Sequence, residues 1–136
     1  MSGIHVRVRA GGEHYALAVE DVTEVGELGD VTPLPGAGRE VLGVRNLRGQ
    51  VIPVLDLPSV LGLETSGERE RIVVAERGDR RAGLAVEGVD GVEALPDASE
   101  DTDSPLLTGA VLVDGGLVGI ISADAVLESV AAAEAP

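Results

Sequence analysis

The sequence predicts an all-β protein made of two similar halves, and three observations carry this prediction. The apolar residues are almost all Val, Leu, Ile and Ala, and Tyr15 is the single aromatic residue. The many β-branched side chains suit pleated surfaces. Short apolar runs alternate with turns rich in Gly, Pro and Asp, and similar runs recur in the same order in both halves.

The internal repeat rests on two matches at nearly the same offset. LAVE at residues 17–20 recurs at 84–87, and valines after it also coincide at an offset of 67. Residues 42–61 overlay residues 108–127 at an offset of 66, with identical glycines at Gly43/Gly109 and Gly49/Gly115. We therefore expect one domain, 1–136, with repeats over about 1–66 and 67–136.

The first half begins with a hairpin signal, because two alternating runs flank Gly11-Gly12. A third short strand, a loop rich in Gly and Pro, two more strands around Arg48-Gly49 and a helical turn follow. The expected strands are residues 4–10, 14–20, 21–26, 42–47 and 50–55, with the loop at 26–38 and the helical turn at 56–63.

The second half repeats this order and has its strongest hairpin signal at Asp114-Gly115. Five short strands per half predict two small barrels or one closed sandwich, and the repeat favours barrels. The expected strands are residues 71–76, 82–87, 89–95, 109–113 and 116–122, with an acidic loop at 96–105 and a C-terminal helix at 123–133.

Four further residues carry structural predictions. Pro53 and Gly119 occupy equivalent places in the last strands, and because neither suits a regular ladder we expect a bulge or barrel corner at each. Tyr15 is expected in the core or at its rim. Arg48 overlays Asp114 in the repeat, so one half places a long cation where the other has an ordinary turn residue.

Composition excludes several classes of function. The formal net charge is −14, all ten basic residues are Arg, and this balance repels nucleic acid and anionic membranes at long range. The absence of cysteine excludes disulfides and thiolate metal sites. Because no run predicts a signal peptide or a membrane span, we expect a cytoplasmic protein without direct membrane insertion.

Catalytic and metal-binding patterns are weak. His5 and His14 lie near predicted strand starts without a metal-ligand spacing, so exposed strand-end histidines are the favoured interpretation. The carboxylates of residues 97–103 lack the pattern of a calcium loop, and Arg-Gly-Asp at 77–79 is typical of a hairpin turn. We expect no enzyme activity, no metal site and no cofactor.

The stretch GVRNLRGQVIPVLDL at residues 43–57 resembles the signature of the chemotaxis coupling protein family, the CheW-like domains. GGEHYALAVEDVTEV and LLTGAVLVDGGLVGII resemble other segments of the same family, so the resemblance extends over nearly the whole chain. The positions that match the signature are Gly43, Asn46, Leu47, Arg48, Gly49, Pro53, Asp56 and Leu57.

The resemblance implies two five-stranded SH3-like barrels related by a pseudo-twofold, with a short helix after the first barrel and a C-terminal helix. It also implies a non-enzymatic adaptor in two-component signal transduction, which joins the cytoplasmic tips of methyl-accepting chemoreceptors to the histidine kinase CheA. The regulatory domain of that kinase is itself CheW-like. The adaptor would be cytoplasmic and recruited to membrane-associated receptor arrays.

Four positions match receptor-side positions of the family: Arg48, Val22, Glu24 and Gly43. Gly49 is expected to permit the turn. Kinase contacts are implied on loops and edges of both barrels, and no kinase-binding residue is assigned. Asp56 is interpreted instead as a cap for the helical turn, and the repeat partner of Val22 makes a core role equally compatible with its position.

Two alternatives remain open at this point. The chain could be an adaptor for another kinase-linked system, such as surface motility. It could also be a small-molecule-binding or hydrolytic β-barrel protein that uses the cleft between the barrels.

Overall fold

The computed structural model describes residues 3–64 and 67–134. The described part of the first repeat contains β1 (Gly3–Ala10), β2 (Glu13–Ala18), the 3₁₀ helix η1 (Val19–Asp21), β3 (Val22–Glu27), β4 (Val41–Leu47), β5 (Gln50–Asp56) and α1 (Leu57–Val60). The second contains β6 (Arg71–Arg77), β7 (Arg80–Val86), β8 (Gly88–Leu95), β9 (Leu107–Val113), β10 (Gly116–Ile121) and α2 (Ala123–Glu134).

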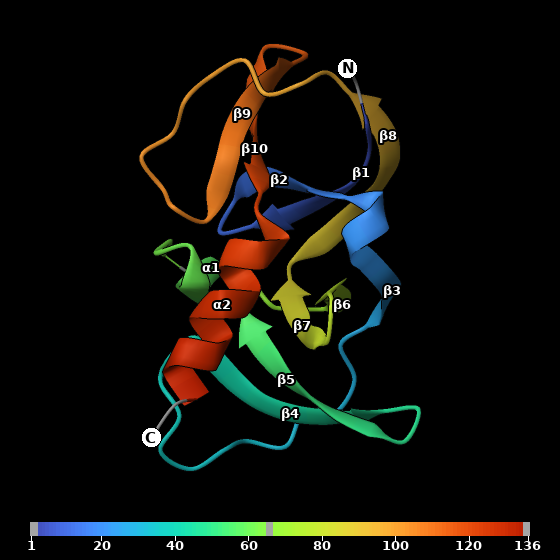
Figure 1. Ribbon diagram of the computed structural model, residues 1–136, viewed down its shortest axis with the longest axis vertical. Helices are drawn as coiled ribbons and strands as arrows, with labels where there is room; N and C mark the ends of the chain where they lie inside the picture. Colours follow the sequence, from blue (N-terminus) through green and yellow to red (C-terminus); the bar gives the residue numbers. More distant parts are fainter. Residues whose placement is uncertain (1–2, 65–66, 135–136) are drawn as a thin grey trace.

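The strands form two five-stranded sheets, as the sequence predicts for a mostly β protein with few helices (Figure 1). Sheet 1 has the order β8-β1-β2-β10-β9, and sheet 2 has the order β3-β6-β7-β5-β4. The sheets differ from the expected repeats in one respect, because each combines strands from both halves of the chain. β3 leaves β2 through η1 and pairs with β6, while β8 pairs with β1.

The repeat nevertheless explains the topology. Replacing every strand of sheet 1 by its repeat counterpart, β1 by β6 and so on, yields the strand order of sheet 2. Each sheet contains one parallel pairing at the equivalent place, β2 with β10 and β5 with β7. Gly43 and Gly109 also share a φ near +150°, at 151° and 155°. These equivalences are what a pseudo-twofold relation between two copies requires.

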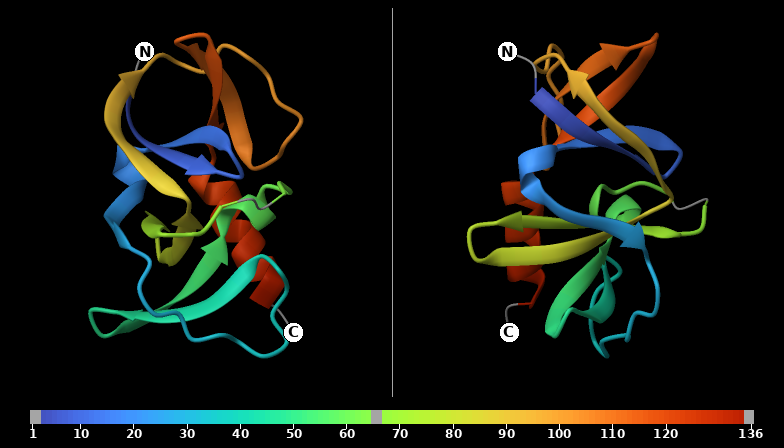
Figure 2. Two further views of the ribbon diagram at one scale, coloured as in Figure 1. Left: turned by 180° about the vertical axis from the view of Figure 1, so that it is seen from behind. Right: turned by 90° about the vertical axis from the view of Figure 1, so that its right-hand side faces the viewer.

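The hydrophobic core lies mainly between the two sheets. β1 and β2 of sheet 1 face β6 and β7 of sheet 2, and α2 contacts β6 and β7 along the side of sheet 2 (Figures 1 and 2). Burial of such apolar surface is the main favourable term in folding. Each sheet also has a smaller apolar cluster of its own. The central cluster includes Val6, Val8, Leu17, Val73, Leu84, Val86, Val126 and Leu127.

The structure shows the expected bulge neither at Pro53 nor at Gly119. Pairing shifts occur between Val41 and Gly43 and between Ile120 and Ile121, rather than at Pro53 or Gly119. A Cβ on Gly119 would lie 2.8 Å from the ring of Tyr15, so this glycine makes room for the buried tyrosine. Tyr15 is therefore a core residue, as one of the two expectations stated.

Candidate functional site

The site begins at the tip of the β4–β5 hairpin, which projects sideways from sheet 2, away from α2 (Figure 1). Arg48 and Gly49 form the turn with φ of 54° and 85°, the two positive values of a type I′ turn. The side-chain oxygen of Asn46 accepts a hydrogen bond from the Gly49 N–H at 2.9 Å. This bond stabilises the turn, and the Arg48 side chain extends into solvent with 84% exposure.

The repeat shows that this backbone does not require an arginine. Asp114 and Gly115 form the equivalent turn of the β9–β10 hairpin, with nearly the same φ values of 50° and 82°. Aspartate tolerates a left-handed conformation better than a long side chain does. Turn geometry therefore does not account for the cation at position 48.

Arg48 is paired with another predicted site residue. Its Nη2 lies 2.9 Å from Oε1 of Glu24 on β3, and Glu24 is 25% exposed. Glu24 precedes Arg48 by 24 residues in the chain, so the pair joins the hairpin tip to a strand distant in sequence. An exposed pair of this kind contributes only about 0–1 kcal/mol to folding. Its main effect is to place a guanidinium and a carboxylate side by side at the surface.

A hollow of about 130 Å³ lies next to this pair. Arg81 on β7 enters it from the neighbouring strand, donating to the side-chain oxygen of Gln50 at 2.6 Å and to Glu76 at 2.9 Å. Two arginines therefore line the hollow together with Leu47, whose side chain is buried. Its lining residues are Thr23, Glu24, Leu47, Arg48, Gln50 and Arg81.

Val22 and Gly43 do not line this hollow. Val22 is half-buried and packs against the core between the sheets, so the structure gives it the core contact that its repeat partner indicated. Gly43 is buried in β4, where a Cβ would lie 2.1 Å from the carbonyl oxygen of Thr32. Thr32 and Val44 pair there through two backbone hydrogen bonds of 2.8 Å. Gly43 shapes the hairpin base by admitting that segment.

Asp56 differs from its expected role as a helix cap. Its side chain makes no capping hydrogen bond to the backbone of α1. Instead the carboxylate, only 4% exposed as a residue, accepts hydrogen bonds from Ser59 and from Nε and Nη2 of Arg69, the last at 2.9 Å. The hydrogen bond from Arg69 to Asp56 is the main cause that raises the pKa of Arg69, with burial opposing it.

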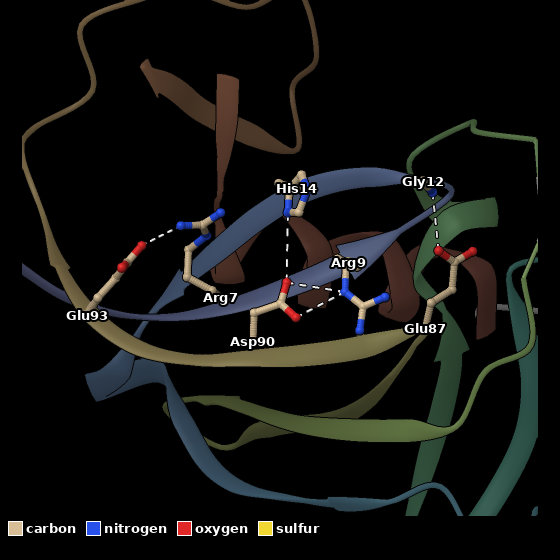
Figure 3. A network of polar contacts seen from close by, with 7 residues as sticks. All are labelled: Arg7, Arg9, Gly12, His14, Glu87, Asp90 and Glu93. Carbon is tan, nitrogen blue, oxygen red and sulfur yellow. Dashed lines mark hydrogen bonds and ion pairs between the residues drawn. The ribbon is translucent and has the colours of Figure 1, made fainter. Parts of the chain in front are cut away.

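The basic residues near the N-terminus form a second polar network on sheet 1 (Figure 3), whereas Arg48 lies at the tip of a hairpin of sheet 2. Arg7 pairs with Glu93, and Arg9 lies 3.0 Å from Asp90, so β1 is joined to the edge strand β8. His14 Nδ1 also lies 3.8 Å from Asp90. His14 is exposed near the start of β2, whereas His5 is half-buried and its ring contacts the Gly3 carbonyl.

Sequence reasoning missed Arg81, Gln50 and Thr23. Gln50 follows the Arg48-Gly49 turn directly, so the hairpin pattern alone places it near Arg48. Arg81 reaches the site because β5 pairs with β7 across sheet 2, and such long-range pairing leaves no local pattern. Arg77, in the Arg-Gly-Asp stretch, is the last residue of β6 and forms an ion pair with Asp21. The stretch lies at the turn of the β6–β7 hairpin, as the sequence predicts.

Within residues 3–64 and 67–134, no group of three or more His, Asp or Glu side chains is placed to hold a metal ion. In the same part of the chain, neither helix has the length and apolar character needed to cross a bilayer. Two larger hollows, of about 340 and 250 Å³, lie near α1, and neither is lined by Arg48 or Glu24.

Comparison with known proteins agrees with this geometry. The chemotaxis protein CheW of Thermotoga maritima is 31% identical over 126 residues, covering 88% of this chain and 83% of the relative. Protein PilI of Pseudomonas aeruginosa is 37% identical over 112 residues, covering 81% of this chain and 62% of the relative. The crystal structure of the scaffolding protein TtCheW from Thermoanaerobacter tengcongensis is 29% identical, with a TM-score of 0.79 and 90% of each chain covered.

The model of the CheW-like domain matches residues 5–131, which include both sheets and the hairpin that carries Arg48. Nearly the whole chain is therefore accounted for by one family, and it is a family of scaffolding and adaptor proteins. The chain belongs to the CheW-like domain family.

Proposed function

We propose that this chain is a non-enzymatic adaptor that couples the cytoplasmic tips of chemoreceptors to the histidine kinase CheA. The observation that carries the proposal is the exposed Arg48 at a rigid turn whose repeat counterpart is Asp114 with the same backbone conformation. A guanidinium offers several N–H donors in a planar fork and can bind a carboxylate through two of them. Arg48 is thus suited to be a principal receptor contact.

The other predicted receptor-side residues have different parts in this proposal. Glu24 holds the Arg48 guanidinium in place through the 2.9 Å pair. Gly43 acts through the conformation of the hairpin base, since its missing Cβ admits Thr32. Val22, the first residue of β3, acts through its packing against the core. Gly49 permits the turn, and a Cβ there would meet no heavy atom within 4 Å.

Each contact of such an adaptor is expected to be modest, with strength that comes from repeated engagement in an array. The chain would be cytoplasmic and recruited to membrane-associated receptors by these contacts. It transmits a signal only if its affinity differs between the kinase-on and kinase-off arrangements. Its two unequal sheets would allow head-to-tail contacts with the CheW-like regulatory domain of the kinase.

The test is binding of the purified chain, in separate assays, to receptor cytoplasmic fragments and to CheA. Arg48→Glu should abolish receptor co-sedimentation and leave kinase binding unchanged. Arg39→Glu is the matched control, because Arg39 is exposed on the loop before β4 and its reversal changes the net charge equally. Retained receptor binding by Arg48→Glu would overturn the role of Arg48.

An adaptor role in another kinase-linked system, such as surface motility, is the second candidate. The observation that favours it is the 37% identity to a relative named PilI rather than CheW. Identification of the kinase and receptor captured from the cell of origin separates the two candidates. Capture of a chemotaxis kinase supports the first candidate, and capture of a different kinase supports the second.

A further inference from the structure

The hollow beside Arg48 contains a second cation that no family pattern in the sequence indicated. Arg81 and Arg48 line the same hollow, with Gln50 and Thr23 beside them. The side chain of Arg81 is 30% exposed and that of Arg48 is 84% exposed, so both guanidinium groups are accessible from solvent. In a chain with 24 acidic and ten basic residues, two arginines converging on one hollow create an unusual local environment.

The present hydrogen-bond partners leave donors of both groups free for a ligand. In the described part of the chain, Arg48 makes one ion pair, with Glu24, and Arg81 makes two contacts, with Gln50 and Glu76. A guanidinium has more N–H donors than these contacts use. The four charged groups, two arginines and two glutamates, also sum to zero. An approaching anion therefore meets a locally neutral surface on an otherwise strongly acidic protein.

The Gln50 contact indicates which kind of ligand Arg81 would take. Its amide oxygen is a neutral acceptor at 2.6 Å from Nη1. A carboxylate at the same place would add the attraction between opposite charges and could accept from two N–H groups of the planar fork. Because Gln50 is exposed at the start of β5, its side chain can give way without disturbing the buried core.

We propose that Arg81 is a second specificity-determining contact of the receptor surface, and that the hollow takes a partner segment with two acidic side chains, one on Arg48 and one on Arg81. This inference rests on the proposed function. It adds a residue and a chemical requirement to it: a partner with one acidic side chain at this surface would bind more weakly than a partner with two.

The experiment compares Arg81→Gln with Arg80→Gln, using a receptor fragment that co-sediments with the wild-type chain. Arg80 neighbours Arg81 on the same strand but is directed toward Glu128 of α2, so its replacement controls for the lost charge. Arg81→Gln should weaken binding by about tenfold, equivalent to about 1.4 kcal/mol. Arg80→Gln should stay within about twofold of wild type. Equal affinities of the two variants would overturn the inference.

A second measurement titrates the wild-type chain itself, and variants serve only to assign its signals. Nitrogen–proton spectra resolve the Nε–H groups of arginines, and Arg48→Gln and Arg81→Gln identify the two signals. Titration with a synthetic helical peptide carrying two glutamates on one face should shift both signals, and the peptide with both replaced by glutamine should shift neither. If Arg48→Glu loses receptor binding while the Arg81 signal stays fixed, the inference fails and the proposed function stands.

Discussion

Arg48 Nη2 and Glu24 Oε1 lie 2.9 Å apart, which unites the turn of the β4–β5 hairpin with the edge strand β3. Both residues belong to the proposed receptor surface, and the fold makes them direct neighbours. Because the pair is exposed, its contribution to stability is small. Its significance lies in the position that it gives to the guanidinium.

Reversal of the Glu24 charge should separate binding from stability. Glu24→Lys replaces the partner of Arg48 by a cation that repels its guanidinium, so receptor binding should be lost. The free energy of unfolding in urea should change by no more than about 1 kcal/mol, since the pair is at the surface. Glu27→Lys, on the same strand, is the control for net charge. An equal loss of binding in both variants would show that general charge, rather than the Arg48 pair, is responsible.

Gly43 and Gly49 should respond differently to alanine. In Gly43→Ala the new Cβ would lie 2.1 Å from the Thr32 oxygen, so we expect destabilisation of at least about 2 kcal/mol and a displaced hairpin base. In Gly49→Ala the Cβ meets open space and the cost is the left-handed conformation alone, about 1 kcal/mol. Chemical denaturation measures both. A smaller loss for Gly43→Ala than for Gly49→Ala would contradict the close approach.

The buried pair of Asp56 and Arg69 should be the most sensitive ionic contact. Arg69→Met leaves the Asp56 carboxylate buried beside Ser59 without its cation, so we expect a loss of about 3–5 kcal/mol in the free energy of unfolding. The exposed pair of Arg9 and Asp90 is the control, and Arg9→Met should cost less than about 1 kcal/mol. Similar losses in the two variants would mean that the burial of Asp56 carries no special penalty.

Because Tyr15 is buried, we expect the protein to lose stability at alkaline pH. Burial, with a smaller effect of the Glu13 charge, raises the pKa of the Tyr15 phenol above its ordinary value. The unfolded chain releases this proton near pH 10, roughly the ordinary value, whereas the folded chain keeps it to higher pH. The folded state therefore binds more protons in that window, and the free energy of unfolding falls as pH rises through it.

The absorbance of tyrosinate follows this titration without interference, because the chain has one tyrosine and no tryptophan. The contribution should be complete below about pH 10 and should decline above it. Tyr15→Phe should remove this part of the pH dependence. A tyrosinate transition in the folded chain at the ordinary pKa would show that the ring is not buried in solution.

Local patterns were sufficient to predict the strands and the turns. The hairpin around Arg48-Gly49 was expected at 42–47 and 50–55 and is found at Val41–Leu47 and Gln50–Asp56. Asp114-Gly115 also forms the predicted turn. These features depend on alternation and on turn residues, both of which are properties of short segments.

Pairing between distant strands was beyond such patterns. Nothing local to residues 21–26 indicates that β3 joins β6 rather than its own hairpin, so local patterns do not predict that β3–β5 share a sheet with β6 and β7, and β8–β10 with β1 and β2. The same reason explains why Arg81 was missed, and why Asp56 was taken for a cap although Arg69 binds it. In each case the partner lies elsewhere in the chain, so no local pattern indicates the contact.

The coupling of receptor to kinase is tested most directly by a three-component sedimentation assay. Membranes with chemoreceptors are spun down with CheA and either the wild-type chain or Arg48→Glu, and the kinase in the pellet is measured. We predict that wild type carries the kinase into the pellet and that Arg48→Glu leaves it in the supernatant although the variant still binds it. Equal amounts of kinase in both pellets would contradict the account.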